Sequence, residues 1–209
     1  MSIDPALVPA APRENEPTAL PHASLDTLRL MAVRRSPKPF HLAEPAPDAA
    51  QLAAILTLAA RTPDHGKRAP WRFIVFEGEA RHRAGDALAA VMAGQGDATE
   101  ETIKATRESL ARAPMVIAVV SAAKPHVKIP EWEQVLSAGA VSYGLILAAH
   151  AFGFGAVWLT GWPTYDAGAR AALGLKDDER LAALIHVGTQ SESQPERARP
   201  DMSAIVTRY

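Results

Sequence analysis

The chain has 209 residues and a mass of 22.3 kDa, a size typical of one domain built on a single hydrophobic core. Its formal net charge is −1, so it lacks the overall positive field that favours binding to nucleic acid or to an anionic membrane. The absence of cysteine excludes disulfides, Fe–S clusters, thiolate zinc sites and a thiol nucleophile. No apolar stretch is uninterrupted for the length of a membrane span, and the N-terminus does not resemble a secretion signal, which favours a cytoplasmic protein.

Residues 1–24 contain five prolines without a helical or strand period, and we expect this leader to be extended or disordered. We expect residues 25–209 to form one domain. Its first helix begins at Leu25 and ends where Pro37 and Pro39 follow. A second helix is capped by Asp48 and ends near residue 61.

The remaining elements mix strands and helices without strict alternation. The predicted strands are Trp71–Phe76, Met115–Ala122, Ala156–Thr160 and Leu181–Gly188, and the predicted helices are Ala80–Met92, Thr99–Ala111, Glu131–Phe152 and Tyr165–Leu173, before an irregular polar tail. The second strand is almost continuously apolar, so both of its faces should be covered. The helix Glu131–Phe152 is apolar almost all round, as expected for contact with several neighbours or a dimer partner. This order predicts an α+β domain with helices around a mostly antiparallel sheet.

Several familiar sites are not supported. The seven histidines show neither H-x-H nor H-E-x-x-H spacing, so no metal site is expected. The segment around Ser142 lacks the first glycine of a hydrolase G-x-S-x-G turn and lies in an apolar helix. Trp158 replaces the third glycine of a dinucleotide fingerprint that would start at Gly153, and a helix precedes it where a strand is needed.

Two loops are cationic although the chain as a whole is slightly acidic. The first loop combines Arg34, Arg35 and Lys38 with the hydroxyl of Ser36, a set of donors that suits a phosphate group. The second loop carries four cations against one acid, and its charged residues are Arg61, Asp64, Lys67, Arg68 and Arg72. Each loop taken alone is equally compatible with a solvated surface. Two such loops in one chain favour a bound anion.

Three segments then resemble a known family. RRSPKPF, RTPDHGKRAPWRFIV and IPEWEQVLSAGAVSYGLILAAHAFGFGAVWLTG occur in this order and look like the FMN-dependent nitroreductase family, in particular its small bacterial NAD(P)H nitroreductase branch with a Pro-Asp-His loop. The resemblance extends from about Leu28 to Gly188. It implies a layered nitroreductase-like sandwich that forms a homodimer, with FMN at the subunit interface.

The resemblance also implies a set of cofactor-binding residues. Arg34, Arg35 and Ser36 are placed at the FMN phosphate and ribityl chain, and Lys38 is placed near flavin N1 and O2. Arg61 is placed at the cofactor, and His65 at the FMN of the partner subunit. The residues placed against the flavin are Trp158, Leu159, Thr160 and Gly161. No catalytic side chain is implied, since the flavin carries the hydride. Lys38 and Arg61 are candidates for electrostatic tuning of the flavin, because a cation near N1 and O2 stabilises its reduced form.

The expected activity is hydride transfer from NAD(P)H through FMN to a small electron-poor acceptor such as a nitroaromatic or a quinone. One alternative is a flavin-binding or flavin-handling protein of the same fold that does not turn over nicotinamide. Others are a flavin-dependent dehydrogenation, oxygen-dependent flavin breakdown, and a plain interaction domain without flavin. The sequence does not select between NADH and NADPH.

Overall fold

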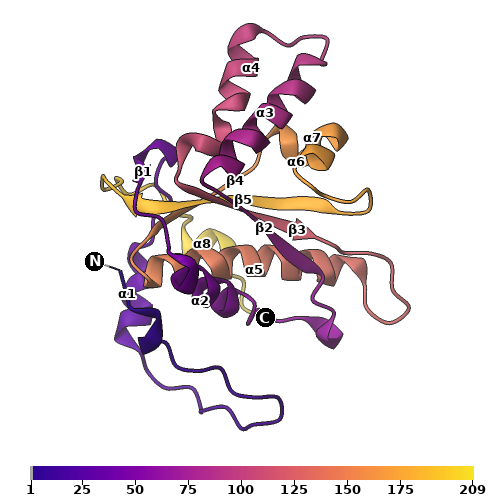
Figure 1. Cartoon of the computed structure of the whole chain (residues 1–209). Helices are drawn as coiled ribbons and strands as arrows, with labels where there is room; N and C mark the ends of the chain where they lie inside the picture. The colour runs from indigo at the N-terminus through magenta and orange to yellow at the C-terminus, as the bar shows by residue number, and fades with distance from the viewer. Residues whose placement is uncertain (1) are drawn as a thin grey trace.

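A computed structural model describes residues 2–209, and its five strands form one sheet in which every pair is antiparallel (Figure 1). The order is β1 (Leu42–Ala43), β5 (Arg180–Gln190), β3 (Met115–Ser121) and β2 (Trp71–Glu77), and β4 (Gly155–Leu159) also pairs with β5. All seven residues of β3 are buried. The predicted α+β class, the antiparallel sheet and the covered central strand are therefore confirmed.

Helices cover both faces of this sheet, as Figure 1 shows. On one face, α2 (Ala49–Ala59) and α5 (Glu131–Ala151) pack on alternate residues of β3 and β5, beginning with Met115 and Ile117. The other face lies under α3 (Glu79–Ala93) and α7 (Ala167–Ala172), together with Leu110 from the turn before β3. Because successive side chains of a strand point to opposite faces, the continuous apolar run of β3 supplies two separate cores.

The long helix α5 is half core and half surface. By length and hydropathy alone it would pass as a membrane span, but half of that apolar stretch is buried inside the protein, as in a core helix. Its outward face is apolar too, because Trp132, Val135, Leu136 and Tyr143 are exposed at helical spacing. Within residues 2–209 each of these four residues stays at least 41% exposed.

The two helices before β2 begin where the sequence predicts. α1 (Leu25–Val33) is capped by Ser24, and Asp48 caps α2 in a capping box with Gln51. α1 has no buried residue, so the apolar side chains of Leu28 and Met31 are exposed. The helical spacing of apolar residues in α1 therefore forms a surface that nothing else in the described part of this chain covers.

The structure differs from the predicted elements at several places, one of them the two-residue strand β1, which the sequence did not predict. The helix expected at Thr99–Ala111 ends as α4 (Glu100–Arg107) and continues as a 3-10 turn over Ser109–Arg112. The helix expected at Tyr165–Leu173 is split into α6 (Trp162–Tyr165) and α7, because the Asp166 side chain accepts the backbone N–H of Ala169 and starts a new helix. The polar tail contains a short helix, α8 (Met202–Ile205).

The proline-rich leader makes specific contacts at its start. Residues Pro5–Leu7 form a 3-10 turn, the N–H of Ile3 donates to the carbonyl of Phe152, and Val8 packs against the α5 side of the core. Residues 9–23 are exposed and contain no helix or strand.

Candidate functional site

The first cationic loop opens into a cavity at one end of the sheet. α1 ends at Val33, and Arg34 and Arg35 line a cavity of about 360 Å³ together with the end of α5, the start of β4 and the tail after β5. Arg34 Nη1 lies 3.5 Å from Ser36 Oγ. The structure thus brings together the three residues predicted at a phosphate group.

His150 joins this cavity, although the sequence analysis gave it no role. Its Nε2 accepts a 3.1 Å hydrogen bond from the backbone N–H of Ala156, so the proton of the neutral ring is on Nδ1. Burial, together with the nearby charge of Arg34, lowers the pKa of His150 to about 4. The only signal in the sequence was a titratable side chain in the last turns of an apolar helix.

One of the two arginines, Arg35, binds to the tail that follows β5. Arg35 Nε donates to the carbonyl of Pro195 at 3.0 Å and lies 3.4 Å from the Glu196 carboxylate. The backbone N–H of Arg197, with smaller contributions from Arg199 and Arg35, lowers the pKa of Glu196. Arg34 makes no ion pair within the described part of the chain, so it is the freer of the two arginines.

β4 leads from this cavity to the segment Trp158–Gly161. Trp158 lies three residues after Gly155, or roughly 10 Å along an extended strand. It is partly exposed, and Thr160 and Gly161 are exposed beyond it. One strand therefore connects the cationic cavity with the residues predicted to lie against a flavin ring.

A second cavity of about 360 Å³ lies beside this segment, with Leu159, Thr160 and Gly161 in its wall. His186, from the middle of β5, also lines it. Its Nε2 lies 3.2 Å from the carbonyl of Ser109, while its buried Nδ1 has no hydrogen-bond partner among the described residues. Burial lowers the pKa of His186 and so favours the neutral ring. Because the carbonyl of Ser109 can only accept, the ring proton is on Nε2, and the buried Nδ1 is an acceptor.

The second cationic loop is less positive than its sequence suggests. Arg72 binds the buried carboxylate of Glu179 through two hydrogen bonds, of 2.8 and 2.7 Å. Lys67 pairs with Glu14 of the leader at 2.7 Å. The local +3 predicted for this loop is therefore largely neutralised.

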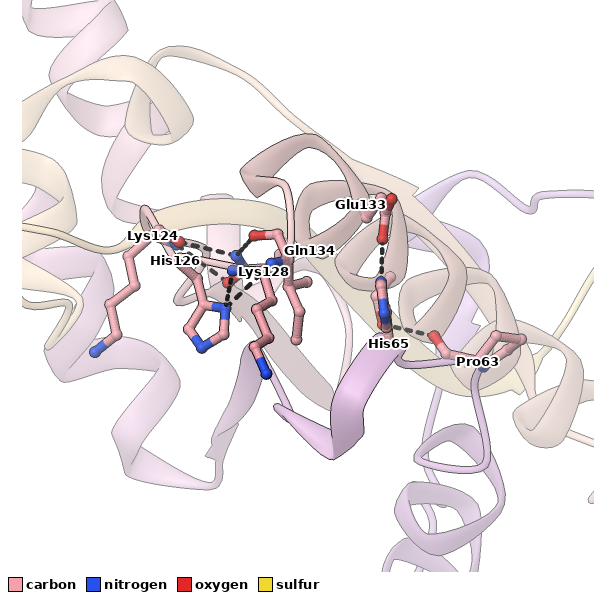
Figure 2. Close-up of polar contacts among 9 residues, drawn as sticks. Pro63, His65, Lys124, His126, Lys128, Glu133 and Gln134 are labelled. Atoms are coloured by element: carbon pink, nitrogen blue, oxygen red, sulfur yellow. Dashed lines mark hydrogen bonds and ion pairs between the residues drawn. The ribbon is translucent and has the colours of Figure 1, made fainter.

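Three predicted cofactor residues are at the surface: Arg61 and His65 of this loop, and Lys38 of the first loop. His65 Nδ1 lies 2.6 Å from Glu133 Oε2, in the first turn of α5, as Figure 2 shows. Arg61 is exposed and lines a hollow of about 430 Å³ with leader residues and α2. Lys38 is exposed too, with its Nζ 5.5 Å from the centroid of the Phe40 ring.

Within one chain, His65 of the second cationic loop does not reach the cavity of the first. His65 contacts Glu133 near the start of α5, whereas Arg34 and Arg35 share a cavity with His150 near its end. These two helix positions are 17 residues apart, which is roughly 25 Å along the helix axis. A single FMN molecule does not span that distance.

Comparison with known proteins agrees with this architecture. The sequence model of the Nitroreductase family matches residues 31–189. A Haemophilus influenzae protein named "Putative NAD(P)H nitroreductase" is 41% identical over 176 residues, covering 84% of this chain and 94% of that protein. "Putative NAD(P)H nitroreductase YdjA" of Escherichia coli K12 is 37% identical over 188 residues, covering 88% of this chain and all (100%) of that protein.

Solved structures show the same fold. A nitroreductase-like family protein from Bacillus cereus aligns with a TM-score of 0.76 at 22% identity, covering 92% of this chain and 99% of the other. A nitroreductase from Desulfovibrio desulfuricans, crystallised in complex with FMN, aligns with a TM-score of 0.67 at 22% identity, covering 90% and 98%. The chain belongs to the nitroreductase family.

Proposed function

We propose that this protein is an FMN-dependent NAD(P)H oxidoreductase that passes hydride equivalents to an electron-poor acceptor such as a nitroaromatic or quinone. The observation that carries the proposal is the cavity lined by Arg34 and Arg35, from which β4 leads directly to Trp158. Relatives at 41% and 37% identity are named NAD(P)H nitroreductases, and a protein of the same fold was crystallised with FMN.

The residues around the first cavity fit the phosphate end of FMN. A phosphate monoester needs several donors and a local positive charge; this cavity offers two guanidinium groups, and the hydroxyl of Ser36 lies 3.5 Å from Arg34 Nη1. His150 adds a ring N–H at Nδ1, because its other nitrogen is occupied by the N–H of Ala156. Trp158, Leu159, Thr160 and Gly161 would then lie along the ring system, which is further along β4.

A homodimer completes this site. His65 is too far from the Arg34 cavity to bind the same FMN in one chain, so it is available to the FMN of a second copy. The exposed apolar face of α5, formed by Trp132, Val135, Leu136 and Tyr143, supplies the surface on which a second copy packs. Leu28 and Met31 on α1 are further exposed apolar side chains available to a second copy.

FMN, when bound, accepts a hydride from the nicotinamide and delivers reducing equivalents to the acceptor. The protein side chains bind and orient the reactants and stabilise charge. Lys38 and Arg61 are exposed cations that would face the polar edge of the ring and favour its negatively charged state. The site needs no nucleophilic side chain. We place this small-molecule chemistry in the cytoplasm, without a nucleic-acid or membrane partner.

Purification of the full chain followed by anaerobic titration tests the proposal. The protein should retain a yellow cofactor with flavin absorbance, and NADH or NADPH should bleach it. Nitrofurazone or menadione should then restore the absorbance. A yellow protein that neither nicotinamide bleaches would instead be a flavin-binding or flavin-handling protein. A colourless protein that does not take up added FMN would contradict both functions.

A further inference from the structure

A third group of cations lies outside the proposed flavin residues, on the loop of residues 122–130 between β3 and α5. Lys124, His126 and Lys128 are exposed there, and their side chains extend from the same side of the loop (Figure 2). Over residues 2–209, neither lysine forms an ion pair. Their charges are therefore not neutralised by the protein itself.

A buried amide holds this loop in one conformation. Gln134 is 3% exposed, and its Nε2 donates to the carbonyls of Lys124 at 2.8 Å and Ile129 at 3.3 Å. Its Oε1 lies 3.3 Å from the backbone N–H of Lys124. These bonds join the two ends of the loop to the first turns of α5. The side chains of Lys124, His126 and Lys128 therefore extend from a backbone that is held in place.

The backbone also sets the tautomer of His126. Its Nδ1 accepts the N–H groups of Lys128 at 3.2 Å and Ile129 at 3.1 Å, so this nitrogen carries no proton. The ring proton is on Nε2, which points away from the loop backbone (Figure 2), and His126 as a whole is exposed. The loop thus presents two ammonium groups and one N–H donor.

This set of donors matches a phosphate group. Two carboxylates are close in sequence, but Glu133 is paired with His65, and Glu131 is exposed in the first turn of α5, where the helix dipole favours an acid. The net charge of −1 gives the whole surface no attraction for a polyanion, so a small phosphate compound fits better than a nucleic acid.

The loop packs directly against the loop that carries His65. A Cβ placed on Gly66 would lie 2.5 Å from Ile129 Cδ1, so the two loops are in close contact there. The geometry points to Lys124, His126 and Lys128 as the site that binds the phosphate groups of the nicotinamide dinucleotide. This inference rests on the proposed function, which places His65 at the flavin of the partner and Arg34 and Arg35 at the flavin phosphate. The phosphates of the nicotinamide nucleotide then need other cations nearby.

Calorimetric binding of nucleotide fragments tests the site without any turnover. The probes are 2′,5′-ADP, which carries a 2′-phosphate, and ADP-ribose, which carries only the pyrophosphate. The variant is Lys124→Gln/Lys128→Gln, and the matched control is Arg83→Gln/Lys104→Gln, which removes two exposed charges from α3 and α4. We expect the Kd of a recognised probe to rise about tenfold or more in the variant alone.

The two probes distinguish which phosphate is bound. Weaker binding of 2′,5′-ADP with unchanged ADP-ribose assigns the loop to the 2′-phosphate and predicts a raised KM for NADPH only. Weaker binding of both probes assigns it to the phosphates that the two dinucleotides share, and raises both KM values. If each probe has the same Kd for wild type, variant and control, the inference is overturned.

A reductant without phosphate separates this inference from the proposed function. 1-Benzyl-1,4-dihydronicotinamide should bleach the flavin of the variant as fast as that of wild type. If it does, and NADH and NADPH also behave identically in both proteins, the function stands and the phosphate site is wrong. If the purified protein holds no flavin and takes up no added FMN, but the variant still loses 2′,5′-ADP binding, the site stands and the function is wrong.

Discussion

His150 Nε2 accepts a 3.1 Å hydrogen bond from the backbone N–H of Ala156, which joins the end of α5 to the start of β4 beside Arg34. The bond needs an unprotonated Nε2, and burial favours the neutral ring. The histidine is therefore held neutral in the folded protein, while it titrates normally in the unfolded chain.

Acid should destabilise the protein through this residue. The pKa of His150 is lowered from 6.5 to about 4, so the unfolded chain binds the proton more tightly than the folded one. The free energy of unfolding should decrease as the pH falls from 6.5 to 4, by up to about 3 kcal/mol. In urea unfolding between pH 7 and pH 4, His150→Gln keeps an acceptor for Ala156 and should show a shallower decrease. An identical pH dependence in both proteins would contradict this assignment.

Glu179 should matter far more for stability than an exposed acid. Its side chain is 5% exposed and binds Arg72 in a bidentate pair, which lowers the pKa of Glu179 to about 2. Glu179→Ala leaves the guanidinium without its partner and should lower the free energy of unfolding by about 2–4 kcal/mol. Asp86→Ala, which breaks the exposed pair with Arg107, is the control and should cost less than about 1 kcal/mol. If both variants lose the same free energy of unfolding, burial of the Arg72–Glu179 pair does not matter for stability.

Arg34 should dominate retention of the flavin phosphate. Replacing Arg34 by Ala removes a charge-assisted bond and should weaken FMN binding by about 1.5–3 kcal/mol, measured by fluorescence titration of apoprotein. Arg83→Ala is a suitable control, because Arg83 is exposed on α3. Arg170 is less suitable, since its guanidinium binds the carbonyl of Tyr165 at 2.7 Å. Unchanged affinity in Arg34→Ala would rule out the assigned phosphate site.

Glu196 should compete with the flavin phosphate for Arg35. Glu196→Gln removes the carboxylate that lies 3.4 Å from the guanidinium, so FMN should bind more tightly than to wild type. The same titration measures the effect, and Glu16→Gln in the leader is the matched control. Weaker binding in Glu196→Gln would mean that the tail positions Arg35 for the phosphate instead of occupying it.

Sharing of the site between subunits should be visible in mixed dimers. Arg34→Ala and His65→Ala chains, each poorly active alone, form heterodimers in which one of the two sites has both residues intact. Random mixing should therefore restore activity to about a quarter of the wild-type level. A mixture as inactive as its two components would place Arg34 and His65 at the same FMN in one chain, against the separation along α5.

The sequence by itself determined the local elements of this protein. Asp48 and Gln51 specify a helix start through their own hydrogen bonds, and the apolar run of β3 requires cover on both faces wherever it lies. The ordered motifs around Arg34 and His65 were also enough to indicate the nitroreductase family.

Only the tertiary structure decided which charges are available and where they meet. Arg72 and Lys67 contributed equally to the predicted positive loop, but Glu179 is 107 residues from Arg72 in sequence and neutralises it by folding. His150 enters the phosphate cavity because β4 packs beside the end of α5, which no local pattern encodes. The separation of His65 from Arg34 likewise follows from the length and packing of α5. Long-range contacts decide these features, so composition and spacing along the chain do not reveal them.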